Sequence, residues 1–139
     1  MSFEAFVQTF KDGEFDGVSR QGVRDAFGPF VRDARAEDWQ LYYDEQNYSD
    51  VMLTPHPTDS TLLRGFTVDR PCGDSRLWDS LAAILRLGNV VLYFPSTCPP
   101  LIGDSKVAAH LPPDMIEAMG QPKCVSTGRE ILDAVQASS

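Results

Sequence analysis

The feature that most constrains the fold is an abrupt change of hydrophobic period in the second half of the chain. Across residues 77–85 the apolar side chains recur at helical spacing, with Asp74 or Ser75 at the N-cap position and Gly88 as a terminator. Residues 90–94 then form an unbroken apolar run of strand-forming type. Such a run is typical of a strand that is covered on both faces. The sequence therefore predicts a helix that leads directly into a central strand.

The first 30 residues have the apolar spacing of two short helices. Between Ser2 and Gly13, apolar side chains one helical turn apart predict an amphipathic helix over about residues 3–12. Its apolar residues are Phe3, Phe6, Val7 and Phe10. Ser19 can cap a second helix, which Gly28-Pro29 should stop or bend. Together the two segments predict an N-terminal helical hairpin.

Between residues 39 and 68 the pattern changes to the two-residue alternation of β-strands. Trp39, Leu41 and Tyr43 alternate with more polar neighbours, and after a polar turn come the apolar residues 51–53. This arrangement predicts a hairpin. Residues 62–68 are rich in β-forming side chains and predict a third strand of an antiparallel meander.

Several short elements are expected after the central strand. Residues 106–109 can add a short edge strand, residues 113–119 a short helix, and residues 123–125 a brief strand. Thr127 and Glu130 match a capping box at the start of a last helix. The prediction is one α+β domain of 139 residues, with two N-terminal helices, an antiparallel meander and a helix-strand-helix-helix C-terminal half on one mixed sheet.

Composition and charge exclude several classes of protein. Hydrophobic residues make up 42% of the chain, which is enough for a core and excludes general disorder. There is no apolar run of membrane-spanning length and no signal peptide pattern at the first residues, so we expect a soluble, cytoplasmic protein. The formal net charge of -8 has the wrong sign for binding nucleic acid or an anionic membrane. A basic protein is the better-matched partner.

No motif in the sequence specifies catalysis, a metal or a cofactor. Cys72, Cys98 and Cys124 are too far apart for a CxxC motif, and we expect three reduced thiols. His56 and His110 lack the spacing of paired metal ligands, and GxSxG and the glycine-rich phosphate loops are absent. We therefore expect no cofactor and no enzymatic activity. The alternatives are a small enzyme that uses Cys72 or His110, and a chaperone-like adaptor for a secreted effector.

The most informative stretch runs from Glu37 to Asp59. It holds six acidic residues and no lysine or arginine, so that -6 of the net charge of -8 falls in one segment. Aromatic residues interleave with the acids, and aromatic anchors of this kind are enriched at protein interfaces. The candidate partner-binding residues are Asp38, Tyr42, Asp44, Glu45, Tyr48, Asp50 and Asp59. In the alternative interpretation, Trp39 and Tyr43 belong to the core and the acids only keep the hairpin in water.

Four segments of the C-terminal half carry a resemblance to a known class of proteins. They are Asp69-Arg70-Pro71, Leu77-Trp78-Asp79-Ser80-Leu81, residues 88–95 and residues 110–115. In these segments the chain resembles bacterial immunity proteins, which are encoded beside toxins such as type VI secretion effectors. The resemblance implies a protein that binds and inhibits a cognate toxin and carries no catalytic residue. From the charge we expect that toxin to be basic, and a nuclease fits this expectation.

Overall fold

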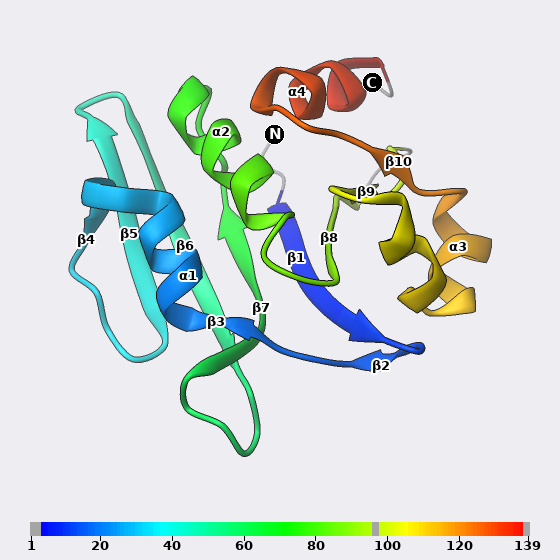
Figure 1. Cartoon of the computed structure of the whole chain (residues 1–139). Helices are drawn as coiled ribbons and strands as arrows, with labels where there is room; N and C mark the ends of the chain where they lie inside the picture. The colour runs from blue at the N-terminus through cyan, green and yellow to red at the C-terminus, as the bar shows by residue number, and fades with distance from the viewer. Residues whose placement is uncertain (1–3, 96–97, 138–139) are drawn as a thin grey trace.

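The computed structural model describes residues 4–95 and 98–137, and these form a mixed sheet flanked by helices (Figure 1). The strands are β1 (Glu4–Lys11), β2 (Glu14–Phe15), β3 (Val18–Ser19), β4 (Val31–Arg32), β5 (Asp38–Asp44), β6 (Asn47–Pro55), β7 (Leu62–Asp69), β8 (Val90–Tyr93), β9 (Leu101–Ile102) and β10 (Lys123–Cys124). The α-helices are α1 (Arg20–Phe27), α2 (Ser75–Ile84), α3 (Pro113–Met119) and α4 (Gly128–Ala137), and the 3₁₀ helices are η1 (Gly28–Phe30) and η2 (Ser105–His110).

The sheet joins the two halves of the chain through its first strand. Its order is β10-β9-β8-β1-β7-β6-β5-β4, while β2 pairs with β1 and β3 pairs with β7. Strands β5, β6 and β7 form the predicted antiparallel meander. Strand β1 lies between β7 and β8 and is antiparallel to both, whereas β10 runs parallel to β9. The α+β class and the mixed sheet are therefore confirmed.

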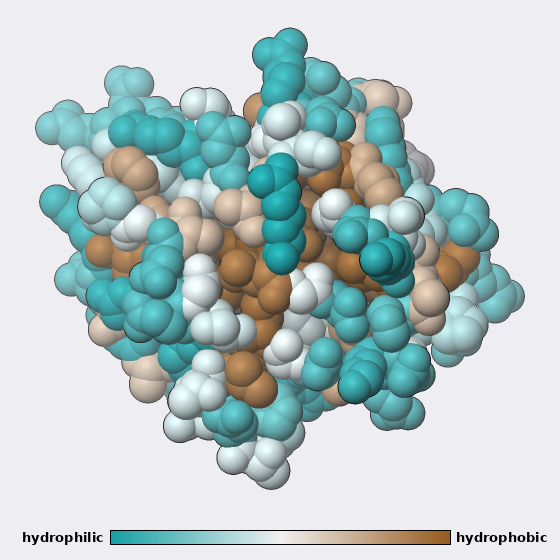
Figure 2. All heavy atoms as spheres, viewed as in Figure 1, coloured by the Kyte–Doolittle hydropathy of each residue, from teal (hydrophilic) through white to brown (hydrophobic). Residues whose placement is uncertain are grey.

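Helices α1, α2 and α4 cover one face of the sheet and bury the main core. Val23 and Phe27 of α1, the apolar side of α2 and Ile131 of α4 pack with alternate residues of the central strands. Figure 2 views the molecule from this side and shows apolar atoms near the middle, surrounded by hydrophilic side chains. A second, smaller core on the opposite face gathers Phe10, Val91 and residues of η2 and α3 at one end of the sheet. The described residues contain no helix long and apolar enough to cross a membrane.

The predicted N-terminal helix over residues 3–12 is wrong, because this segment is strand β1. The spacing of Phe6, Val7 and Phe10 fits one side of a helix, but in the strand these residues serve different surfaces. Val7 is buried in the main core, Phe10 belongs to the second core, and Phe6 is half-buried on the opposite face from Val7. Both faces of β1 therefore carry apolar side chains with contacts elsewhere in the fold. The pairing of β1 within the sheet overrides the helical spacing of its apolar residues. Ser2 and Phe3 lie outside the described residues.

The local signals for α1, α2 and α4 are confirmed by their N-caps. The Ser19 hydroxyl accepts a hydrogen bond from the Gly22 amide at the start of α1, and the Asp74 carboxylate accepts one from the Arg76 amide at the start of α2. The Thr127 hydroxyl accepts a hydrogen bond from the Glu130 amide, and α4 begins at the next residue, Gly128. One further prediction is wrong, since residues 106–109 lie in η2 rather than in an edge strand. Strand β9, which the sequence did not indicate, supplies the pairing next to β8.

Gly65 is the position in β7 where the sheet tolerates no side chain. It lies opposite Gln8 of β1 and Thr54 of β6, and a Cβ atom there would run into the Val7 carbonyl oxygen. The neighbour in conflict is backbone, which cannot rotate away. The close approach of β1 and β7 therefore depends on glycine.

We expect Gly65→Ala to lower the free energy of unfolding by about 3 kcal/mol or more, because overpacking against backbone forces strands apart. Gly73→Ala is the matched control, since nothing lies within 4 Å of its added Cβ. Urea unfolding followed by circular dichroism measures both. If the two variants are equally stable, the pairing of β1 with β7 is not as tight as described.

Candidate functional site

The candidate site is the part of the sheet that no helix of the described residues covers. Strand alternation places one set of side chains in the main core and the next set on the opposite face over β5, β6, β7 and β1. We call this surface the open face. Its residues are Glu4, Phe6, Gln8, Asp38, Gln40, Tyr42, Tyr48, Asp50, Met52, Thr54, Thr67 and Asp69.

Three carboxylates form a row across the open face. In the sheet register Asp50 of β6 lies opposite Asp69 of β7, and Asp69 lies opposite Glu4 of β1. Within the described residues none of the three forms an ion pair with a lysine, arginine or histidine. Like charges directly opposite each other on neighbouring strands are destabilising. This carboxylate row therefore lowers the stability of the free chain, and the fold itself does not require it.

Aromatic and apolar side chains lie on both sides of the carboxylate row. Along β6, Asp50 lies between Tyr48 and Met52, whose exposed fractions are 54% and 48%. Tyr48 is the register partner of Tyr42 on β5. On β1, Phe6 follows Glu4 on the same face, and its ring stacks on Tyr93 of β8 with 5.3 Å between centroids. The face thus combines negative charge with large contact groups, as protein-binding surfaces do.

Arginines border the open face but do not neutralise it. Arg32 of β4 lies over the Tyr42 ring, 3.9 Å from its centroid, at the outer strand. Arg35 makes a 3.8 Å ion pair with Asp38. Both side chains are exposed, and exposed pairs of this kind contribute little to stability. The negative charge at the centre of the face therefore remains available to a partner.

The sequence-predicted site residues divide into three groups. Asp38, Tyr42, Tyr48 and Asp50 lie on the open face. Asp44 and Glu45 belong to the hairpin end between β5 and β6, and Asp59 lies in the loop between β6 and β7. Because these two connections are at opposite ends of β6, Asp59 is separate from the hairpin turn.

Two of these carboxylates already have local hydrogen-bonding roles. Asp44 accepts hydrogen bonds from the Asn47 side chain and from the Gln46 and Asn47 amides, and the contact with the Asn47 side chain chiefly lowers its pKa. Asp59 accepts from the Thr61 hydroxyl and amide, which lowers its pKa in the same way. Both are turn-stabilising residues in the free chain. This makes them weaker candidates for partner contact than Asp50.

Sequence analysis missed Glu4, Phe6 and Asp69. None of them lies in the acidic segment, and Glu4 and Phe6 were predicted to lie within a helix over residues 3–12. They reach the site only because β1 inserts between β7 and β8. No local pattern indicates that pairing, so the carboxylate row could not have been found from spacing alone.

The structure keeps the two alternative catalytic residues apart. Cys72 follows the end of β7 that pairs with Glu4, whereas His110 contacts Asp12 just beyond the other end of β1. The separation is roughly 25 Å, the length of an eight-residue strand. Cys98 is buried and Cys124 is exposed, and none of the three cysteines forms a disulfide. Among residues 4–95 and 98–137, no three His, Cys, Asp or Glu side chains are grouped as metal ligands.

Comparison of the chain with protein-family models, curated proteins and solved structures finds no match. The interpretation of the open face therefore depends on its own chemistry.

The middle carboxylate of the row gives a direct test of the electrostatic description. Asp69→Asn removes both like-charge contacts at once, so we expect the free energy of unfolding to rise by about 0.5 to 1 kcal/mol at low salt. The gain should disappear near 1 M salt, where the Debye length is about 3 Å. Glu117→Gln, an exposed change on α3, is the control and should stay within about 0.5 kcal/mol of the native chain. A loss of stability in Asp69→Asn would show that the row is structural.

Proposed function

We propose that the chain is an immunity-type inhibitory protein that binds a basic toxin in the cytoplasm through its open face. The observation that carries the proposal is the carboxylate row of Glu4, Asp69 and Asp50, which has no cation partner in the described residues. Lysine or arginine side chains of a partner would remove the repulsion within the row. The carboxylates that repel one another in the free protein would thus attract the cations of the partner and stabilise the complex.

The aromatic and apolar groups beside the row support binding to a protein rather than to a small cation. Tyr48 and Met52 are about half exposed, so that a partner can bury them. Buried tyrosines at the centre of interfaces often supply much of the binding free energy, while charges guide the encounter. A basic substrate groove, such as that of a nuclease toxin, presents the complementary charge. Binding there would occlude the groove and inhibit the toxin.

The two other candidate functions have less support. An enzyme that uses Cys72 or His110 has less support, since β1 separates these residues and neither can act as acid or base for the other. A chaperone-like adaptor would present an extended apolar groove. The large apolar residues with high exposure are instead Phe15, Tyr48, Met52 and Leu87, and acids lie among those of the open face. An inhibitor of a basic protein accounts for both the charge and the aromatic groups.

The proposal is tested by association kinetics with a basic protein captured from the native cell with the chain as bait. The association rate constant should fall as salt rises, because electrostatic steering is screened. Changing both Asp50 and Asp69 to lysine should lower it at least tenfold at low salt. Changing Asp44 and Glu45 to lysine should lower it less, since those carboxylates lie at the end of the hairpin.

Tyr48→Ala should act on dissociation instead, and raise the dissociation rate constant about fivefold to 150-fold for 1 to 3 kcal/mol of lost contact. Glu117→Lys on α3 is the charge-reversal control and should leave both rate constants nearly unchanged. Stopped-flow binding at low and high salt measures all variants. If the association rate constant changes neither with salt nor with the lysine substitutions at Asp50 and Asp69, this result would contradict binding at the open face.

A further inference from the structure

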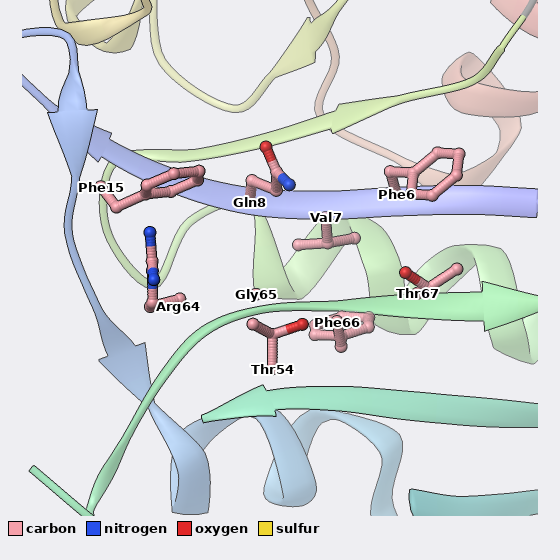
Figure 3. Close-up of a pocket in the computed structure, with 9 residues that line it drawn as sticks. All are labelled: Phe6, Val7, Gln8, Phe15, Thr54, Arg64, Gly65, Phe66 and Thr67. Carbon is pink, nitrogen blue, oxygen red and sulfur yellow. The ribbon is translucent and has the colours of Figure 1, made fainter. Parts of the chain in front are cut away.

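The open face ends in a small hollow on the side away from the carboxylate row. Gly65 contributes no side chain between Gln8 and Thr54, and a space of about 210 Å³ remains there (Figure 3). Arg64 lies beside it on β7, five residues before Asp69 in the same strand. That step corresponds to roughly 16 Å of strand. The Arg64 end of the hollow therefore lies away from the carboxylate row, while Phe6 and Thr67 at its other end are the next residues after Glu4 and Asp69 on the same face.

Arg64 is the cation of this hollow and has no anionic partner among the described residues. Its guanidinium carbon lies 3.9 Å from the centroid of the Phe15 ring, which holds the side chain in place. The side chain is only partly exposed, and it makes no ion pair and no side-chain hydrogen bond within the described part of the chain. A guanidinium presents paired N–H donors that match a carboxylate.

The other groups around the hollow suit the same ligand. Gln8, Thr54 and Thr67 bring an amide and two hydroxyl groups, and Figure 3 shows Phe6 and Phe15 at its two ends. Small-molecule sites usually measure about 300 to 1,000 Å³, so this hollow is sized for a single side chain. Donors close to a partly exposed guanidinium favour a carboxylate on a short apolar stem, such as that of glutamate or aspartate.

Other titratable groups face Arg64 from the neighbouring segments. Glu14, Asp16 and His56 line an adjoining hollow that shares Arg64 and Phe15. Neither carboxylate lies within ion-pair distance of the Arg64 guanidinium. They are therefore competitors for Arg64 in the free chain rather than its established partners.

We propose that the Arg64 hollow receives a glutamate or aspartate side chain of the protein that binds the open face. This inference rests on the proposed function, because it assigns a second contact on the same surface. The open face then has a negative end at the carboxylate row and a positive end at Arg64. A partner with a basic patch and one acidic side chain at a matching distance fits in a single orientation, which gives specificity beyond net charge.

Acetate is the probe, because it carries the carboxylate without any partner protein. Sodium acetate is titrated at neutral pH into the ¹⁵N-labelled chain, with sodium chloride as the reference at equal ionic strength. We expect saturable shifts of the Gly65 amide and the Arg64 Nε–H signal with acetate and not with chloride. Equal shifts with the two salts would overturn the proposal.

Variants separate the hollow from general anion binding. Arg64→Gln should abolish the saturable shift, and Arg64→Lys should weaken acetate binding at least threefold, because the charge remains without the paired donors. Arg24→Gln, which changes an exposed side chain of α1, should bind acetate as the native chain does. If the Arg64→Gln variant still binds acetate, Arg64 is not the residue that binds the carboxylate.

The competing carboxylates and the partner give two further outcomes. Changing Glu14 to Gln together with Asp16 to Asn should leave acetate binding as tight or tighter, and weaker binding there would overturn the proposal. If the acetate titration fails, only the proposal that the Arg64 hollow binds a carboxylate is refuted. If association with the partner does not depend on salt, the proposed function itself is refuted. The two failures are therefore distinguishable.

Discussion

Strand β1 is hydrogen-bonded to β7 on one side and to β8 on the other, and this double pairing makes the sheet continuous. It joins the meander of the N-terminal half to the buried strand that follows α2. It also places Glu4 opposite Asp69 and Phe6 opposite Tyr93, so the same pairing builds the open face. The glycine at position 65 allows β7 to approach β1 closely. Fold and candidate site therefore depend on one set of backbone contacts.

The two faces of the sheet have different tasks. Helices α1, α2 and α4 bury one face, and this burial supplies most of the hydrophobic stabilisation. The opposite face carries like charges side by side, which lowers stability slightly. Proteins keep such unfavourable arrangements chiefly where function needs them. In the acidic hairpin Trp39 and Tyr43 belong to the core, as the alternative interpretation predicted, while Tyr42 and Tyr48 face outward, where the proposed binding role needs them.

Local signals in the sequence predicted the elements whose structure is local. The caps at Ser19 and Asp74 and the apolar run of β8 need only neighbouring residues, and they were correctly assigned. Strand β1 was not, because its phenylalanine spacing fits a helix and its role depends on partners distant in the chain. The candidate site follows the same division. Asp50 and Tyr48 were found from composition, whereas Asp69 and Glu4 join them only through the sheet order.

Site-specific cross-linking can show whether the open face, and not the helix-covered face, binds a basic protein. A photo-cross-linking amino acid placed at Met52 on β6, or at exposed Ala83 on α2, tests it in the native cell. Binding at the open face predicts one discrete product from position 52, containing a protein of high isoelectric point, and its loss when Asp50 and Asp69 are changed to lysine. It predicts no such product from position 83. A product from position 83 with none from position 52 would contradict binding at the open face.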